Sequence, residues 1–228
     1  MPSRPTPLFK QQLWQEEVSP VAGVDEVGVG AWAGPVIAAA VVLPRELSLQ
    51  GLNDSKLLST KRRAALFDAI RACAVAIGVG RVEVAEIDQL NVYWAAMLAR
   101  QRAVEALVPA PAHVLVDGKR RITGLKLPQT PIIEGDRLHP SISAASIIAK
   151  VTCDRLMEEL GALYPAYGFE RHKGYGTPEH LAALTQRGPL AVHRRSYLPV
   201  IAAEGRQREF FLRPNTGKHT GRQYSRRK

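Results

Sequence analysis

The chain has 228 residues, of which 46% are hydrophobic and 23% are charged, a length and composition that suit one domain with a sizeable core. The hydrophobic fraction excludes wholesale disorder, and the two cysteines, Cys73 and Cys153, lie too far apart in sequence to indicate a disulfide scaffold or a zinc ribbon. The longest apolar run, residues 36–43, is too short to span a bilayer, and the N-terminus lacks the apolar stretch of a secretory signal. We therefore expect a protein of the reducing cytoplasm with no membrane partner.

Basic residues outnumber acidic residues, with 31 Lys and Arg against 21 Asp and Glu and a formal net charge of +10. Eight of those basic residues and two of the acidic ones fall in residues 202–228. A basic chain favours polyanionic partners, of which nucleic acid is the commonest, while a solubilising tail is the alternative explanation.

The first half of the chain predicts a cluster of strands. Residues 1–18 carry three prolines and little pattern, which indicates a flexible leader. Residues 21–43 predict two strands joined by a glycine-rich turn. After a loop, a helix is expected from Ser59 or Thr60 to about residue 72, and the alternation in residues 74–84 predicts a third strand.

Helices and strands then alternate. A long helix is expected over residues 87–107, with Trp94 and Met97 in the core, followed by a short strand at 113–118 and a strand-like run at 130–136. Strands that first cluster and then alternate with helices predict an α/β fold with a mixed β-sheet flanked by helices.

The last part of the chain predicts two helices and a tail. Residues 140–160 have the apolar spacing of a helix, and a short helix is expected to begin at Thr177 and Pro178. Residues 205–228 are too polar and too basic to pack, so we expect a disordered tail.

The placement of acidic residues is the strongest chemical signal in the chain. Asp25 and Glu26 lie inside an apolar strand, where charges are costly unless they are paired or bind a metal ion. Asp117 ends a strand, and Asp136 follows the strand-like run before the next helix. Strand ends are where α/β sheets assemble their sites, and carboxylates with no Cys and little His nearby suit Mg²⁺ or Mn²⁺. Pairing with Arg or Lys, or capping of a turn, above all by Asp136, is the alternative.

Residues 28–33 match the G-x-G-x-x-A dinucleotide fingerprint, which would indicate an oxidoreductase. Gly34, Pro35 and an apolar strand follow, whereas a pyrophosphate needs the N-terminus of a helix there. The pattern therefore disfavours a nucleotide cofactor, and a test of NAD(H) binding would separate the two hypotheses.

Six blocks of sequence carry a resemblance to a known family. They are D-E-V-G-V-G at 25–30 with A-G-P-V at 33–36, N-D-S-K at 53–56, V-D-G at 116–118, G-D at 135–136 with S-A-A-S-I-I-A-K-V at 143–151, H-K-G-Y-G-T at 172–177 with E-H at 179–180, and H-R-R-S-Y at 193–197. In this order and spacing, the blocks resemble the signature of the type 2 ribonucleases H, also called ribonuclease HII.

The resemblance implies a ribonuclease H-like mixed β-sheet with a small helical C-terminal part, in one catalytic domain over residues 19–204. It also implies an endoribonuclease that degrades the RNA strand of RNA–DNA hybrids and cuts 5′ to a single ribonucleotide in duplex DNA. The products would carry 3′-hydroxyl and 5′-phosphate ends. Two divalent ions, Mn²⁺ or Mg²⁺, would support the hydrolysis without a protein nucleophile.

By the same resemblance, Asp25, Glu26, Asp117 and Asp136 would be the catalytic, metal-binding carboxylates. The residues that would contact the substrate are Gly28, Val29, Gly30, Lys56, Ser146, Lys150, His172, Lys173 and Tyr175. Tyr175 would stack on the sugar after the ribonucleotide, and the two glycines would let the backbone approach its 2′-hydroxyl. Taken singly, the lysines could be ordinary surface residues, and His172 could be a solvated loop histidine.

Val29 departs from the family pattern, which usually places an arginine between the two glycines. Valine offers no donor to a phosphate, so we expect retained chemistry with weaker or less selective binding. The alternative is a nucleic-acid-binding protein with weak catalysis. The presence of all four acids argues against this alternative.

The related type 3 ribonuclease H usually carries an additional N-terminal domain and a Gly-Lys-Gly turn. The leader of about 18 residues leaves no room for that domain, so we expect type 2. The resemblance implies RNA–DNA hybrid and ribonucleotide-containing DNA as partners, with replication or repair proteins as further candidates and ribonucleotide excision repair as the process. We expect a monomer.

Overall fold

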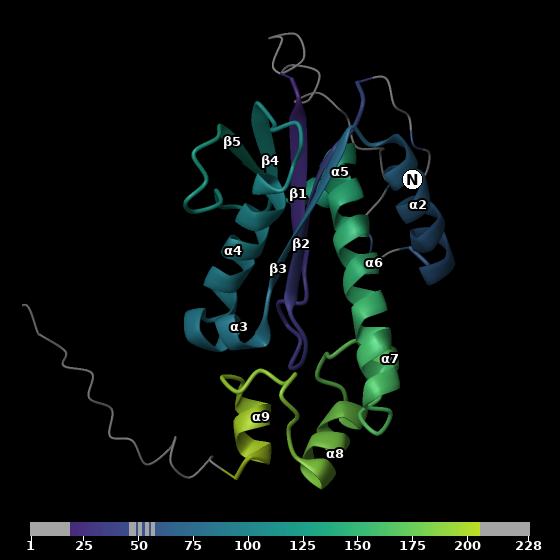
Figure 1. Ribbon diagram of the computed structural model, residues 1–228, viewed down its shortest axis with the longest axis vertical. Coiled ribbons are helices and arrows are strands. Elements are labelled where there is room, and N and C mark those ends of the chain that lie inside the picture. The colour runs from purple at the N-terminus through teal and green to yellow at the C-terminus, as the bar shows by residue number, and fades with distance from the viewer. Residues whose placement is uncertain (1–18, 46–48, 50–51, 53–54, 56–57, 206–228) are drawn as a thin grey trace, which may run out of the picture.

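The computed structural model describes residues 19–45, 49, 52, 55 and 58–205, so the expected leader, most of the tail and Lys56 lie outside the described residues. Its centre is a five-stranded mixed sheet in the order β3-β2-β1-β4-β5 (Figure 1). The strands are β1 (Val21–Val27), β2 (Val36–Val42), β3 (Ala76–Val82), β4 (His113–Asp117) and β5 (Gln129–Ile132). β1, β2 and β3 pair antiparallel, whereas β4 pairs parallel with both β1 and β5. The predicted mixed sheet is confirmed.

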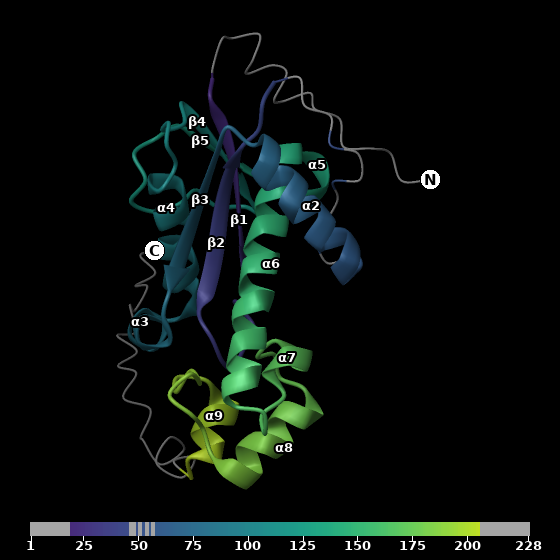
Figure 2. The ribbon, with the colours of Figure 1, turned by 45° about the vertical axis from the view of Figure 1, so that its right-hand side comes forward.

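Helices cover the sheet and extend past one of its ends, where the last three form the small helical C-terminal part (Figures 1 and 2). None of the described helices is both long and apolar enough to cross a membrane. The described helices are α2 (Thr60–Cys73), α3 (Val84–Leu90), α4 (Val92–Glu105), α5 (Gly135–Leu138), α6 (Pro140–Leu163), α7 (Phe169–His172), α8 (Pro178–Arg187) and α9 (Leu198–Ala203).

Two apolar layers hold the helices on the sheet. Apolar side chains of α4 pack with the strands on one face, and those of α2 and α6 pack on the other. Gly23 of β1 allows α6 to come very close, since a Cβ at this position would overlap the backbone of Ser141 and Ile142. This approach matters for function because α6 carries Ser146 and Lys150 past the strand that bears Asp25 and Glu26.

The single helix expected over residues 87–107 is instead two helices, α3 and α4, separated at Asn91. Asn91 has a φ of 66°, and its side chain accepts hydrogen bonds from the backbone N–H groups of Tyr93 and Trp94. The predicted core position of Trp94 is wrong, since 46% of this residue is exposed, whereas Met97 is buried as expected. None of α5, α7 and α9 was expected, and α5 occupies the end of the predicted strand-like run at 130–136. The helix predicted to begin at Thr177 is confirmed by the cap that Thr177 provides to α8.

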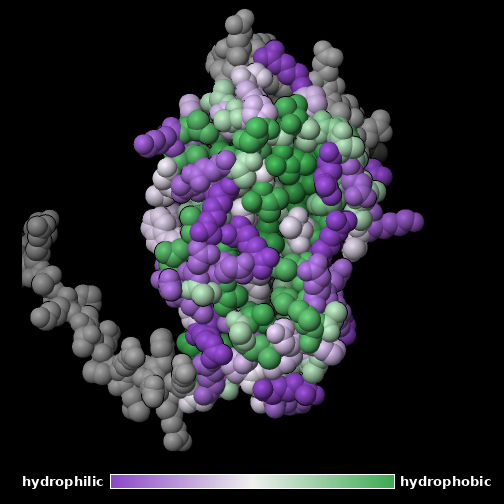
Figure 3. Space-filling view, viewed as in Figure 1, coloured by the Kyte–Doolittle hydropathy of each residue, from purple (hydrophilic) through white to green (hydrophobic). Residues whose placement is uncertain are grey.

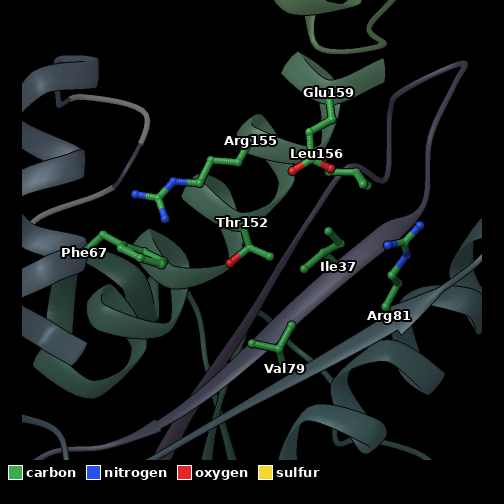
Figure 4. Close-up of a pocket in the computed structure, with 8 residues that line it drawn as sticks. All are labelled: Ile37, Phe67, Val79, Arg81, Thr152, Arg155, Leu156 and Glu159. Carbon is green, nitrogen blue, oxygen red and sulfur yellow. The ribbon is translucent and has the colours of Figure 1, made fainter. Parts of the chain in front are cut away.

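A shallow apolar pocket of about 330 Å³ opens between β2, β3 and α6. Ile37 and Val79 of the strands and Phe67 of α2 line it, with Arg155 on the side of Phe67 and Arg81 on the opposite side (Figure 4). Apolar residues also gather along the middle of this face between polar flanks (Figure 3). None of the predicted site residues lines this pocket, so it is not the candidate active site.

Candidate active site

The sheet brings the first three predicted carboxylates together. β1 carries Asp25 and Glu26 near its C-terminal end, and Asp117 is the last residue of β4. These two strands are parallel neighbours with Val24 beside Val116, so Asp25 and Asp117 follow at adjacent positions. Carboxyl ends of parallel strands commonly form the site of an α/β protein, so this edge of the sheet is the candidate site.

Asp25 is the most constrained of these acids. Only 8% of it is exposed, and its carboxylate accepts hydrogen bonds from the backbone N–H of Glu26, at 2.8 Å, and from the hydroxyl of Ser146. Burial, and then the negative charges of Glu26 and Asp117, raise the pKa of Asp25 to about 8, although Ser146 and Arg100 act in the opposite direction. A cation placed beside these groups would offset the repulsion between their negative charges.

Glu26 has a buried arginine as its partner. Arg100 of α4 donates from Nε to Oε2 of Glu26 at 2.5 Å, and its Nη2 also pairs with the same oxygen. This pair could not be predicted from the sequence, because the two residues are 74 positions apart and Arg100 occupies an ordinary position in a helix. Arg100 therefore belongs to the site as the group that orients Glu26.

Asp136 meets Asp117 through its backbone. The N–H of Asp136 lies 3.4 Å from Oδ1 of Asp117, and the hydroxyl of Ser143 donates to the carbonyl of Asp136. Both acids are half-buried. Within the described part of the chain, no three His, Cys, Asp or Glu side chains already form a ligand cluster for a metal ion.

A cavity of about 300 Å³ joins Asp25 and Glu26 to other predicted site residues, whereas Asp117 and Asp136 do not line it. Its lining consists of Asp25, Glu26, Val27, Ser55, Ser146, Lys150 and Tyr175. The hydroxyls of Ser55 and Ser146 lie 2.9 Å apart, and Lys150 donates to Asp154 at 2.6 Å from one wall. The predicted residues Ser146, Lys150 and Tyr175 thus share one cavity with Asp25 and Glu26.

The glycine turn lies beside Tyr175. Gly28 has a φ of 88°, which favours glycine, and the N–H of Ala31 closes the turn onto its carbonyl at 3.2 Å. Ala31 forms a β-bridge with Tyr175, and a Cβ on Gly30 would stand 3.7 Å from the Tyr175 ring. Val29 and Tyr175 are each more than one-third exposed, so the turn and the aromatic ring present a common open surface.

Two other predicted substrate contacts have partners inside the protein. His172 is 8% exposed, its Nε2 donates to the carbonyl of Tyr167 at 2.7 Å, and its Nδ1 accepts from the N–H of Gly174 at 3.2 Å. It is therefore a buried residue and not a solvated loop histidine, and it holds the segment that carries Tyr175. Lys173 donates to Glu158 at 2.6 Å.

Comparisons with known proteins place the chain in a family. The family model for ribonuclease HII matches residues 22–200. The chain is similar to a ribonuclease HII of Anaeromyxobacter sp. (strain Fw109-5), with 54% identity over 86% of this chain and 62% of that protein, so it spans less than two-thirds of this relative's length.

Solved structures show the same fold. The ribonuclease H2 of Pyrococcus horikoshii OT3 has a TM-score of 0.67 and 29% identity over 83% of this chain and 99% of that one. A ribonuclease HII of Archaeoglobus fulgidus, solved in complex with PCNA, has a TM-score of 0.66 and 28% identity over 78% of this chain and 95% of that one. The ribonuclease H-like fold expected from the sequence is confirmed.

Proposed function

The chain belongs to the ribonuclease HII family of hydrolases, and we propose that it cleaves the RNA strand of RNA–DNA hybrids and cuts 5′ to a single ribonucleotide in duplex DNA. The observation that carries this proposal is the cavity that Asp25 and Glu26 share with Tyr175. The cavity offers carboxylates for hydrolysis and an aromatic ring for recognition of a sugar. The glycine turn lies next to that ring, since Ala31 forms a β-bridge with Tyr175.

Divalent cations fit the carboxylate wall by their donor preference. Asp25, Glu26, Asp117 and Asp136 would hold two ions, Mg²⁺ or Mn²⁺, because these hard ions prefer carboxylate oxygens. The raised pKa of Asp25 supports the fit, since a cation favours the ionised form that its neighbours disfavour. When bound, the ions supply activation of a water molecule and stabilisation of the leaving oxygen.

The residues around the carboxylates have distinct proposed roles. Ser146 holds Asp25, and Arg100 orients Glu26. Gly28 and Gly30 present the backbone of the turn to the ribose 2′-hydroxyl, and Tyr175 offers its exposed ring to the neighbouring sugar.

The lysines and the turn are the proposed contacts to phosphate groups. Lys150 and Lys173 would exchange their carboxylate partners for phosphate, whereas Val29 would make only apolar and backbone contacts. Lys56 completes the proposed set, and His172 acts indirectly by holding the segment of Tyr175.

The proposal also covers the setting of the reaction. We infer one catalytic domain over residues 19–204 that acts as a monomer in the cytoplasm, in ribonucleotide excision repair. Replication or repair proteins are the proposed protein partners, in line with the Archaeoglobus fulgidus relative solved with PCNA.

The decisive experiment uses end-labelled duplex DNA that carries one ribonucleotide, with Mg²⁺, Mn²⁺ or a chelator, beside a long RNA–DNA hybrid. We expect one metal-dependent cut 5′ to the ribonucleotide and many cuts in the hybrid. An Asp25→Asn variant serves as the control for contaminating nucleases. Absence of metal-dependent cutting on both substrates would refute the proposed function.

A further inference from the structure

Arg194 is a buried cation without an acidic partner. It is 0% exposed, and within the described residues it forms no ion pair. Burial is also the main cause that lowers the pKa of its guanidinium. A buried charge without a counter-ion is costly, and an apolar side chain of similar volume would avoid that cost. Stability alone therefore does not explain why an arginine occupies this position.

The hydrogen bonds of Arg194 supply the reason. Its Nε donates to the carbonyl of Gly34 at 3.0 Å, and Nη2 donates to that of Pro35 at 3.1 Å. Its Nη1 donates to the carbonyl of Val29 at 3.2 Å, at the other end of the same turn. One planar side chain thus ties together the beginning and the end of the segment between β1 and β2.

Tyr197 completes this clamp. Its hydroxyl accepts from Nη1 of Arg194 at 3.1 Å and donates to the carbonyl of Val29 at 2.8 Å. The Val29 carbonyl therefore accepts two hydrogen bonds, which fixes the peptide plane between Val29 and Gly30. Gly28 lies next to the guanidinium, since a Cβ there would stand 3.7 Å from Nη2 of Arg194.

The clamped turn is also fastened to the segment that carries Tyr175. The N–H of Trp32 donates to the carbonyl of Gly174, and the N–H of Arg194 donates to the carbonyl of Trp32, both at 2.8 Å. Bridges join Ala31 to Tyr175 and Ala33 to His193. The turn therefore lies between the segments that carry Tyr175 and Arg194, and hydrogen bonds to both segments set its orientation.

We propose that Arg194 and Tyr197 are positioning residues that set the selectivity for a single ribonucleotide. This inference rests on the proposed function. A single ribonucleotide offers one 2′-hydroxyl, so its recognition depends on one accurately placed turn. A long hybrid offers a 2′-hydroxyl at every step of the RNA strand, so a loosened turn still finds productive positions.

The test compares kcat/KM on the two substrates. Tyr197→Phe removes only the hydroxyl, and Arg194→Lys keeps the charge but loses the planar fork. We expect both variants to lower kcat/KM for the single ribonucleotide about 10-fold or more, and that for the long hybrid less than about 3-fold. Tyr167→Phe is the matched control, because its hydroxyl also donates to a backbone carbonyl, that of Gly188, away from the turn.

The outcomes separate this inference from the proposed function. A selective loss in Tyr197→Phe but not in Tyr167→Phe supports the clamp, even where Arg194→Lys fails to fold. An equal loss on both substrates, or no loss in Tyr197→Phe, overturns the clamp and leaves the nuclease function standing. A wild-type enzyme that cuts only long hybrids also overturns it, and one that cuts neither substrate overturns both proposals.

Discussion

At the scale of single residues, Asp25 shows how a site can oppose the stability of its own fold. Its carboxyl is buried beside Glu26 and Asp117, which raises its pKa to about 8 from the ordinary value of 3.8. Between these two pH values the folded chain retains a proton that the unfolded chain has lost, so this group destabilises the fold increasingly as pH rises.

We therefore expect Asp25→Asn to abolish cleavage and yet to stabilise the cation-free protein. The gain in the free energy of unfolding is about 1–3 kcal/mol at pH 8 and close to zero at pH 4. Chemical denaturation at both pH values with a chelator measures it, with Asp68→Asn on the exposed side of α2 as the control. A gain that does not depend on pH would contradict the raised pKa.

Val29 offers a second prediction at this scale. Its side chain is exposed while its carbonyl is held by Arg194 and Tyr197, so a longer side chain can be placed there without disturbing the turn. Val29→Arg should tighten binding of ribonucleotide-containing duplex about 3- to 10-fold, because a guanidinium adds a contact to phosphate.

Equilibrium binding in chelator measures this effect without cleavage. Val108→Arg is the matched control, since it adds the same charge at a residue that is 83% exposed and lies beyond the C-terminal end of α4. Equal gains in affinity for the two variants would attribute the effect to net charge alone. No gain in either variant would refute the expected role of position 29.

At the scale of elements, Asn91 explains why the pattern of residues 87–107 was misleading. Apolar spacing continues across the break, but the backbone of Asn91 has a φ of 66° and a ψ of 163°, a conformation that favours glycine. Its side chain compensates by accepting from two N–H groups at the start of α4.

Asn91→Ala loses this cap and keeps the backbone strain, so we expect it to lower the free energy of unfolding by about 1–2 kcal/mol. Asn91→Gly loses the cap but relieves the strain, and its effect should stay within about 0.5 kcal/mol. Urea denaturation of both variants makes the comparison. Equal losses would show that the φ of Asn91 carries no cost.

Local pattern predicted the strands and the acids at their ends, because period-two alternation and buried charges are readable within one segment. Ser146, Lys150 and Tyr175 were named through family resemblance, and the structure places them at the cavity. The contacts of Arg100 and Arg194 were not predictable, although Arg194 lies in the H-R-R-S-Y block, since each residue contacts others 74 or more positions away. Their roles arise only when α4 and the C-terminal part pack against β1 and the turn.

A buried pair of histidines in the C-terminal part gives a prediction on pH. The Nε2 atoms of His180 and His193 lie 3.0 Å apart, and Nδ1 of His180 donates to the carbonyl of Tyr175. Burial is the main cause that lowers the pKa of each to about 4. The unfolded chain therefore binds more protons between pH 6.5 and 4, and stability is lost as pH falls through this range.

The variant His193→Gln removes one of these titrating groups. Its free energy of unfolding should fall less steeply between pH 6.5 and 4 than that of the wild type, by about one proton in the linkage slope. Denaturation at half-unit steps of pH measures the slope. An unchanged slope would mean that His193 accepts a proton without unfolding.

At the scale of the whole molecule, the site is composite. The sheet supplies Asp25, Glu26 and Asp117, and the C-terminal helical part supplies Tyr175 and Arg194. The turn of residues 28–35 continues from β1 into β2 and is hydrogen-bonded to the C-terminal part. Neither part alone contains the cavity, so the proposed recognition and hydrolysis would both depend on the packing between them.

The charge of the chain gives the last prediction. Residues 206–228 hold eight basic residues and one acidic residue, and we expect this segment to add contacts to phosphate wherever the duplex binds. Each such contact contributes about −0.9 to the slope of log K against log salt concentration on duplex DNA.

Deletion of residues 206–228 should therefore make this slope shallower by the contribution of one or more contacts, and should weaken binding to duplexes of all sequences alike. A tail of equal length with Gln in place of Lys and Arg is the matched control, because it keeps chain length and removes charge. If this neutral tail retained the wild-type slope, charge in this segment would have no part in binding, and the net charge of the chain would serve solubility instead.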